Sequence, residues 1–258
     1  MPPDIAFAEE RRQLISSLLQ ARGRVTVEEL AALFNVSKVT VRKDLAWLES
    51  QGLVTRTHGG AIPAGQTPFD LAFSTRMQLH AGEKECIGRA AAALVQDGDS
   101  IAIDASTTVL KMVRHLMQRT GLTVIANGLR AAEELVAIPG INAILPGGLL
   151  SPNSLSLVGH WGEKMLEEVH IQKVFVGGWG FTLEEGLTDI NIDDVRLKRS
   201  MIAAAKEVYV LIDHSKWGRL ASTTFCPTAD IKTILTDAQA PDAMVIAARQ
   251  AGIDVRLV

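Results

Sequence analysis

Apolar residues in the first part of the chain recur at the spacing of one helix face, and they do so three times. The three stripes predict three short helices. Their members are Leu14, Ile15, Leu18 and Leu19, then Leu30, Leu33 and Phe34, then Val41, Leu45 and Leu48. After the third stripe, the alternation in 53–60 and the Gly59-Gly60 tip predict a short β-ribbon.

Local signals set the limits of these helices. Gly23 is expected to end the first helix. Thr26 and Glu29 form a capping box at the start of the second helix. Asn35 and Val36 make a tight turn, and the third helix is expected to run from an N-cap at Ser37 to a C-terminal glycine at Gly52. Helix, turn, helix and ribbon in this order predict a winged helix-turn-helix over residues 1–62.

The composition changes over residues 63–82, which contain Pro63, Gly65 and Pro68. This segment is expected to connect two domains and to carry a short helix over 70–80. We also expect 61–82 to couple the two domains functionally.

From residue 83 onward, short apolar strands alternate with helical segments. The alternation predicts a mainly parallel sheet covered on both faces, hence an α/β domain over 83–258. The predicted strands are 100–104, 122–125, 142–145, 173–176, 208–212, 231–235 and 254–257, and the predicted helices are 83–95, 108–117, 130–136, 160–169, 193–205 and 243–250.

Charge and cysteine content exclude few classes of protein. The chain of 258 residues has a net charge of −3, although 8 basic against 7 acidic residues leave 1–62 slightly positive, so a DNA-binding surface would have to be a local patch. Cys86 and Cys226 match no metal spacing and are expected to be buried free thiols. There is no visible signal peptide and no apolar run long enough to span a bilayer, so we expect a cytoplasmic protein without membrane contact.

Basic side chains gather around the predicted third helix. With its aliphatic stripe turned inward, this helix presents Lys38, Thr40, Arg42 and Lys43 near its positive N-terminal end, where they can meet the major groove. Arg56 and His58 on the ribbon are expected to contact phosphates or the minor groove. Asp44 should lie at the core edge beside a basic neighbour. The alternative, that these helices bind a protein, conflicts with their lysines, which interface cores avoid.

The segment from Ser37 to Ala61 resembles the signature of the DeoR family. That signature has Ser, then Thr-Ile/Val-Arg-Arg/Lys-Asp-Leu, then Leu, Gly, Arg and His-Gly-Gly-Ala, and it is matched here in register. The resemblance implies a transcriptional regulator whose recognition helix and wing use Ser37, Lys38, Thr40, Arg42, Lys43, Arg56 and His58. Lys43 stands where the family's second arginine is usual, which keeps the charge and loses the planar fork.

Polar or glycine-rich loops follow several predicted strands. Asp104–Thr108 comes after one strand and opens a helix whose amides can bind an anion. Since ligands of open α/β sheets bind at the carboxyl ends of strands, these loops predict one shared crevice. Lys216 would supply a cation there. The other loops are Asn127-Gly128, Pro146–Gly148, Gly177–Gly180, Gly186–Thr188 and Asp213–Lys216. Each of these loops could also be a turn or a helix cap without a role in binding.

Residues from about 75 to 258 resemble the DeoR C-terminal sensor domain, which is related in fold to ribose-5-phosphate isomerase and binds sugar phosphates or similar metabolites. The resemblance implies that Ser106, Thr107 and Thr108 hold phosphate and that Asp104, Asn127 and Lys216 line the pocket. The remaining expected pocket residues are Gly147, Gly148, Trp179, Asp194, Lys198 and Asp213. Ser106 replaces the usual glycine, Asp194 the usual glutamate, and Trp179 adds bulk, all of which bear on the identity of the effector.

The alternative function is a sugar-phosphate isomerase with an added DNA-binding head. The related isomerases carry acidic residues in the loop that corresponds to 177–180, and none is present here. We therefore expect a repressor of a carbohydrate-catabolic operon and no enzyme. We expect it to bind double-stranded operator DNA and a phosphorylated metabolite, to form a dimer or tetramer, and to need no cofactor or metal.

Overall fold

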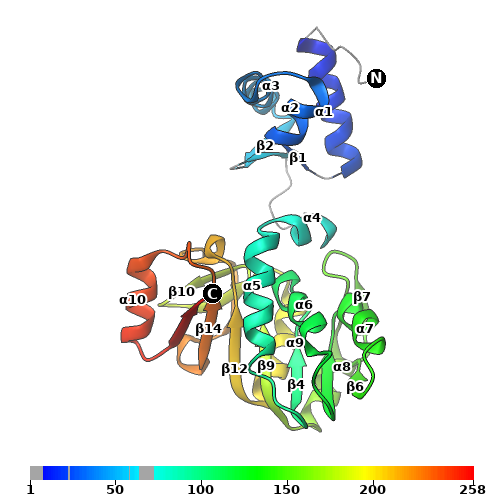
Figure 1. Cartoon of the computed structure of the whole chain (residues 1–258), viewed down its shortest axis with the longest axis vertical. Coiled ribbons are helices and arrows are strands. Elements are labelled where there is room, and N and C mark those ends of the chain that lie inside the picture. Colours follow the sequence, from blue (N-terminus) through cyan, green and yellow to red (C-terminus); the bar gives the residue numbers. More distant parts are fainter. Residues whose placement is uncertain (1–7, 23, 58, 64–72) are drawn as a thin grey trace. The chain divides into compact units, whose positions relative to one another are not determined.

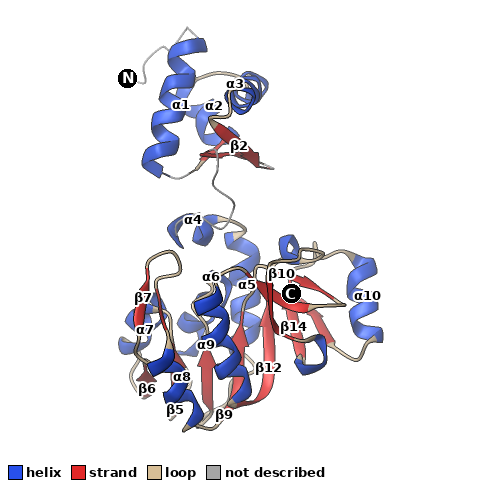
Figure 2. Ribbon diagram, turned by 180° about the vertical axis from the view of Figure 1, so that it is seen from behind, coloured by secondary structure: helices blue, strands red, loops and turns tan. Residues whose placement is uncertain are grey.

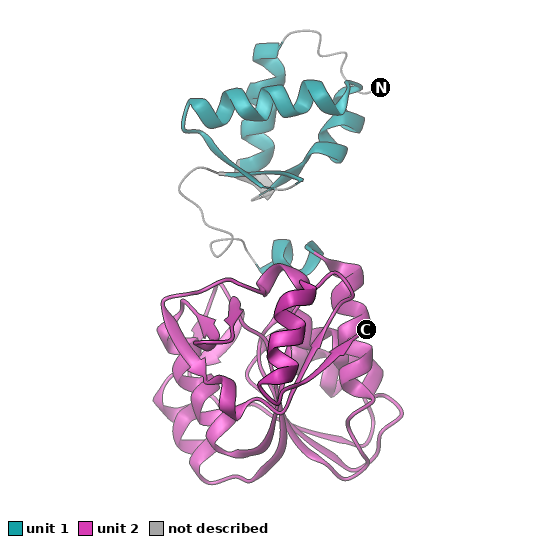
Figure 3. Ribbon diagram, turned by 90° about the vertical axis from the view of Figure 1, so that its left-hand side faces the viewer, with its two compact units in different colours: residues 1–79 teal, residues 80–258 magenta. Residues whose placement is uncertain are grey.

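The computed structural model describes residues 8–22, 24–57, 59–63 and 73–258. The chain forms two compact units, Met1–Leu79 and His80–Val258 (Figure 3). The division falls inside the predicted connection 63–82. Gly23, His58 and residues 64–72 lie outside the described residues, so the predictions for them stay untested.

The N-terminal unit contains the predicted helices and ribbon (Figure 1). One strand of the ribbon, β3, also pairs with a short strand that the sequence pattern did not predict, which gives an antiparallel sheet of order β1-β3-β2. The bounds are α1 Ala8–Arg22, β1 Val25–Thr26, α2 Val27–Phe34, α3 Lys38–Ser50, β2 Val54–Thr57, β3 Gly60–Pro63 and α4 Phe73–Gln78. The element order of a winged helix-turn-helix is thus present.

Caps and apolar stripes explain why these helices form where they do. Thr26 and Glu29 make both bonds of the capping box at α2. Asn35 ends α2 in the left-handed conformation, with φ 50°, as its tight turn requires. The inward stripes share one core, whose buried members are Ile15, Leu19, Val25, Val27, Leu30, Phe34, Val41, Leu45, Leu48, Val54 and Ala61.

The C-terminal unit is built on a seven-stranded parallel sheet of order β15-β14-β12-β9-β4-β5-β6. The chain runs outward from β4 to β6 on one side and from β9 to β15 on the other. The strand order therefore reverses between β4 and β9. The bounds are β4 Ser100–Ile103, β5 Leu122–Ala126, β6 Ile141–Ile144, β9 Ile171–Val176, β12 Ala205–Leu211, β14 Thr233–Thr236 and β15 Asp254–Leu257.

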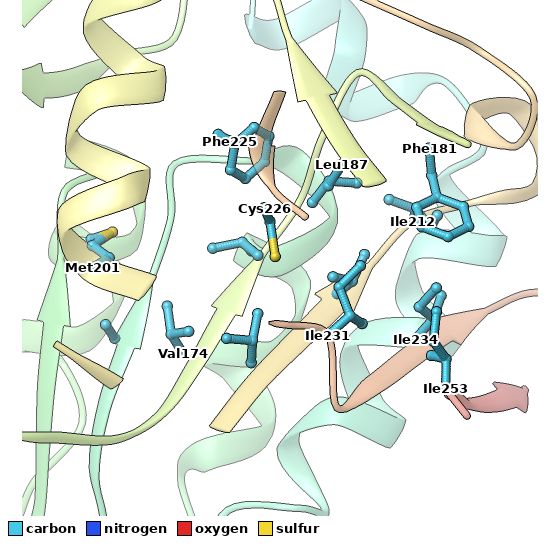
Figure 4. Close-up of a cluster of buried hydrophobic side chains, with 14 of the residues drawn as sticks. Val174, Phe181, Leu187, Met201, Ile212, Phe225, Cys226, Ile231, Ile234 and Ile253 are labelled. Atoms are coloured by element: carbon cyan, nitrogen blue, oxygen red, sulfur yellow. The ribbon is translucent and has the colours of Figure 1, made fainter. Parts of the chain in front are cut away.

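Helices cover both faces of this sheet. Helix α5 lies in front of the sheet in Figure 1, and α9 lies in front of it in the reverse view of Figure 2. Figure 4 shows part of the core. It is filled by side chains from α9, from the sheet and from the segment around Cys226. The helices are α5 Ala81–Ala92, α6 Thr107–Val113, α7 Leu129–Val136, α8 His160–Glu167, α9 Ile192–Ala203 and α10 Asp242–Gln250, with 3-10 turns η1 Arg114–Leu116, η2 His214–Lys216 and η3 Thr228–Asp230.

Two small antiparallel sheets were not predicted from the sequence. One is the hairpin of β7 Leu149–Ser151 and β8 Ser156–Val158, and the other has the order β10-β11-β13, with β10 Gly180–Thr182, β11 Gly186–Asp189 and β13 Thr223–Cys226.

Both cysteines are free, but only Cys226 is buried, so the expectation that Cys86 is buried was wrong. Among the described helices, none combines the length and apolar character needed to cross a membrane.

Candidate DNA interface and effector site

Helix α3 turns its aliphatic stripe into the core, as the sequence predicted. Val41, Leu45 and Leu48 are at most 1% exposed. Arg42 and Lys43 are exposed on the outer side, and neither takes part in an ion pair within the described part of the chain. Their charges are therefore available to a polyanion such as DNA.

Other residues that were predicted to contact DNA have partners within the N-terminal unit. The Ser37 hydroxyl accepts a hydrogen bond from the Thr40 amide at 3.1 Å, which makes Ser37 the N-cap of α3. Lys38 pairs with Glu28 across the turn. Arg56 of β2 lies 2.8 Å from a carboxylate oxygen of Glu49. Lys38 and Arg56 thus each have an acidic neighbour.

A buried ion-pair network fixes α3 against α1. Asp44 is 2% exposed, and its carboxylate accepts hydrogen bonds from Arg11 Nε at 2.6 Å and Arg12 Nε at 2.9 Å. The Arg12 guanidinium also lies 4.4 Å from the centre of the Trp47 ring. The predicted basic partner of Asp44 is thus confirmed as two arginines, which hold the recognition helix in place.

In the C-terminal unit, polar loops meet where the strand order reverses. Asp104 follows β4, Gly177 follows β9, and the Gly177 amide donates a hydrogen bond to Asp104 Oδ2 at 3.1 Å. Asn127 follows β5, and Asp213 follows β12 shortly after its last residue. These four strands are neighbours in the sheet, so their loops lie at one edge, as predicted for a ligand crevice.

Lys198 is the centre of the charged part of this edge. Its ammonium lies 3.1 Å from Asp104 Oδ2, 2.8 Å from Asp189 Oδ2 and 3.0 Å from the Gly177 carbonyl oxygen. Burial lowers the pKa of Lys198, but Asp189 and Asp104 outweigh burial, so the pKa is raised and the side chain is a cation. Sequence reasoning found Asp104 and Lys198 but missed Asp189, which an antiparallel strand supplies.

Asp194 lies one helical turn before Lys198, in contact with serines of the β7-β8 hairpin. Its Oδ1 accepts a hydrogen bond from Ser156 Oγ at 2.8 Å, and Ser154 Oγ lies 3.4 Å away. Burial raises the pKa of Asp194, and Lys198 and Ser156 only partly oppose this effect. The hairpin serines were missed because an isolated serine carries no spacing signal.

Two buried oxygen atoms at this edge have no hydrogen-bond partner among the described residues. They are Asn127 Oδ1 and Asp213 Oδ2, and both side chains are 1% exposed. Buried acceptors without a partner cost stability, so each calls for a donor from outside the chain. They are the clearest structural mark of a ligand site in this unit.

Cations surround Asp213. Burial raises the pKa of Asp213, but Lys216, the Ser215 hydrogen bond, Lys84 and His80 together lower it below its usual value. Lys84 comes from α5 and is only 4% exposed. In the sequence, Lys84 stands at helical spacing from Ile87 and Ala91 on the apolar face of this helix, and this spacing is the signal that could have identified it.

The remaining residues that were predicted to line the pocket make local structural contacts of their own. Ser106 is the N-cap of α6, accepting a hydrogen bond from the Val109 amide at 3.2 Å, while Thr107 and Thr108 are buried in its first turn. Gly147 and Gly148 have positive φ angles before β7, where they shape the hairpin. Trp179 stacks with Arg219, whose guanidinium lies 5.6 Å from the ring centre. Their contacts with an effector stay predictions.

Two family models match this chain. The model described as the DeoR-like helix-turn-helix domain covers residues 11–67, and that of the DeoR C terminal sensor domain covers residues 79–238. The chain belongs to the DeoR family. This DeoR-family protein is a DNA-binding transcriptional regulator with a sensor domain for a small molecule.

Its curated relatives match over nearly their whole length. The HTH-type transcriptional regulator GolR of Listeria innocua is 36% identical over 97% of this chain and 99% of its own. The putative aga operon transcriptional repressor of Escherichia coli O157:H7 is 33% identical over 98% and 95%. The HTH-type transcriptional repressor GlcR of Bacillus subtilis is 36% identical over 90% and 89%.

Similar solved structures are distant. Ribose 5-phosphate isomerase A of Methanocaldococcus jannaschii has a TM-score of 0.39 and 19% identity, over 54% of this chain and 55% of that chain. The full-length sorbitol operon regulator SorC of Klebsiella pneumoniae has a TM-score of 0.37 and 13% identity, over 82% and 90%.

Proposed function

We propose that this regulator represses a carbohydrate-catabolic operon in the bacterial cytoplasm and that a phosphorylated sugar changes its affinity for operator DNA. The observation that carries the effector proposal is the pair of buried, unpartnered oxygens, Asn127 Oδ1 and Asp213 Oδ2. An acceptor oxygen needs a donor, and sugar hydroxyls are donors. Lys84 and Lys216, whose charges act on Asp213, are suited to a phosphate group of the same ligand.

The DNA part of the proposal rests on α3. Arg42 and Lys43 leave the helix on its exposed side, where they can contact bases and phosphates while Val41 and Leu45 hold the helix in the core. A good bidentate contact from arginine to guanine discriminates by about 1–3 kcal/mol. One such helix reads a short site, so we propose a dimer or tetramer that reads two half-sites.

Coupling between effector and operator is expected to be about 1–3 kcal/mol, which changes operator affinity by roughly 5- to 150-fold. The test measures fluorescence anisotropy of labelled DNA from upstream of the chain's own operon, with and without each member of a panel of phosphorylated sugars. The same sugars without phosphate are the controls. Asp213→Asn should abolish the effector response and leave DNA binding intact. An unchanged response in this variant would overturn the proposed site.

The DNA contact is tested separately. Arg42→Ala and Lys43→Ala should each weaken operator binding and reduce its dependence on salt by about one charge. Leu33→Ala, a change on the exposed side of α2, is the control that keeps the charges. Operator binding that both variants retain at full strength would contradict the role of α3. Sedimentation analysis of the same samples tests the dimer or tetramer.

A further inference from the structure

Two histidines and a glutamate that are distant in sequence lie together in the C-terminal unit. His80 is the N-cap of α5, and Glu83 lies in the first turn of that helix. His214 begins the η2 turn after β12. One ligand atom from each of the three lies within 4.8 Å of the other two. The two imidazole rings meet edge to face, with 4.7 Å between their centres.

We propose that His80, Glu83 and His214 bind a divalent transition metal ion of the zinc class. Two imidazole nitrogens and one carboxylate oxygen form the donor set of zinc sites that keep a further position open. Nitrogen ligands favour Zn²⁺, Co²⁺ or Ni²⁺ over Ca²⁺ and Mg²⁺, which prefer oxygen alone. The open position would take water or an oxygen atom of a small molecule.

His214 is held in the orientation that metal binding requires. Its Nδ1 lies 2.9 Å from Asp237 Oδ2, and the other oxygen of the same carboxylate accepts the His214 backbone amide at 2.7 Å. Asp237 is 3% exposed and also accepts the Gln239 amide. A carboxylate on Nδ1 keeps the proton there and leaves Nε2 free to bind a metal, as in carboxylate–histidine–zinc arrangements.

Distances and access fit a site that closes around an ion. Donor atoms around a tetrahedral ion with bonds of about 2.0–2.1 Å lie roughly 3.3 Å apart, so the separations in the present cluster must shorten by at most about 1.5 Å. His80 and Glu83 are half-buried, which leaves their side chains room to rotate toward the fixed ring of His214. The bond that Glu83 would give up is a 3.2 Å contact with the Gln239 side chain.

The charged groups around the three ligands are of both signs, because Lys84 and Lys216 lie on the Asp213 side of the cluster. The charged groups that act on His80 are the Asp213 and Glu83 carboxylates, with Lys84 and His214 opposing them, and Asp237 adds a third carboxylate behind His214. A bound ion would join the first residue of the sensor unit to the loop that carries Asp213 and Lys216. Metal binding and effector binding would then act on the same loop, although the metal site does not depend on the identity of the effector.

The test is a titration of the metal-free full-length protein with Zn²⁺ by calorimetry and with Co²⁺ by visible absorption. One ion per chain is expected, with Co²⁺ bands typical of nitrogen and oxygen ligands. His80→Asn, Glu83→Gln and His214→Ala should each weaken binding at least about tenfold, and Asp237→Asn roughly 10- to 100-fold. Asparagine suits position 80, since its backbone has φ 52°.

His115→Ala is the matched control. His115 Nε2 lies 2.8 Å from Glu85 Oε1, and among the described residues no second histidine completes a metal-binding group there, so the variant should keep wild-type affinity. Circular dichroism of the metal-free variants checks that each is folded. If His214→Ala unfolds, the half-buried positions 80 and 83 carry the test alone. The absence of stoichiometric binding, or wild-type binding by both His80→Asn and Glu83→Gln, would overturn the proposal.

Discussion

The two units use their cations in opposite ways. In the N-terminal unit, Arg42 and Lys43 are exposed and have no ion-pair partner among the described residues. In the C-terminal unit, Lys198 is buried and lies within 3.1 Å of two carboxylates. An exposed charge is stable in water until a polyanion approaches, whereas a buried charge must be compensated within the fold. The same residue type is therefore available to a partner in one unit and is compensated by carboxylates of the fold in the other.

The largest test of this comparison makes the same change on both sides. Lys198→Met should destabilise the sensor unit by about 3–5 kcal/mol, because it leaves the buried Asp104 and the partly buried Asp189 without their cation. Lys43→Met removes an exposed charge and should change the free energy of unfolding by less than about 0.5 kcal/mol. Urea unfolding of both variants measures the difference. Equal costs would show that burial does not distinguish the two cations.

The head contains one buried network of its own, which provides the next test. Asp44→Ala leaves Arg11, whose side chain is 7% exposed, without its carboxylate, and should cost about 3 kcal/mol. The cost should fall slightly below that of Lys198→Met, because Arg12 is partly exposed and can turn to water. Urea unfolding of the full chain measures this cost, and Trp47, which stacks with Arg12, is the one tryptophan of residues 1–79 and contributes the signal of that unit. A cost below about 1 kcal/mol would contradict a supporting role for the network.

A smaller loss of stability is expected from a packing contact in the C-terminal unit, where the backbone of Gly177 lies against Ser106. A Cβ atom at Gly177 would lie 2.6 Å from Ser106 Cβ and closer still to its hydroxyl. Gly177→Ala should therefore cost about 1–3 kcal/mol through overpacking. Ser106→Gly should recover most of this loss, since glycine replaces a serine N-cap at a cost of only a few tenths of a kcal/mol. A double-mutant cycle in urea measures the coupling, and strictly additive effects would rule out the contact.

The fold could be predicted from the sequence to the extent that local periodicity determines it. The stripe of Val41, Leu45 and Leu48 and the capping box at Thr26 identified the head correctly, because both signals lie within a few residues. The parallel strands were recognisable as short apolar runs between helices. Strand β1, only two residues long, carries no periodic signal and appears only through its pairing with β3.

The site was predictable where a motif follows a strand and not where distant elements meet. Asp104 and Lys198 were found through family motifs, whereas Asp189 reaches Lys198 from the antiparallel strand β11. The cluster of His80, Glu83 and His214 likewise depends on the packing of α5 beside the turn after β12. No local pattern encodes such contacts, because the residues that make them are separated by several strands and helices along the chain.

The smallest expected effect lies at the wing and sharpens the account of exposed cations. Arg56 is 45% exposed and pairs with Glu49, an exposed acid of the helix that also carries Arg42 and Lys43. Glu49→Gln should leave stability nearly unchanged, because exposed ion pairs contribute about 0–1 kcal/mol. It should raise operator affinity about 2- to 5-fold at low salt, since Arg56 is released and a charge that repels phosphate is removed. Glu133→Gln, which breaks an exposed pair with Arg130 in the other unit, is the control. Operator affinity that rises equally in both variants would mean that net charge, not the wing, sets the gain.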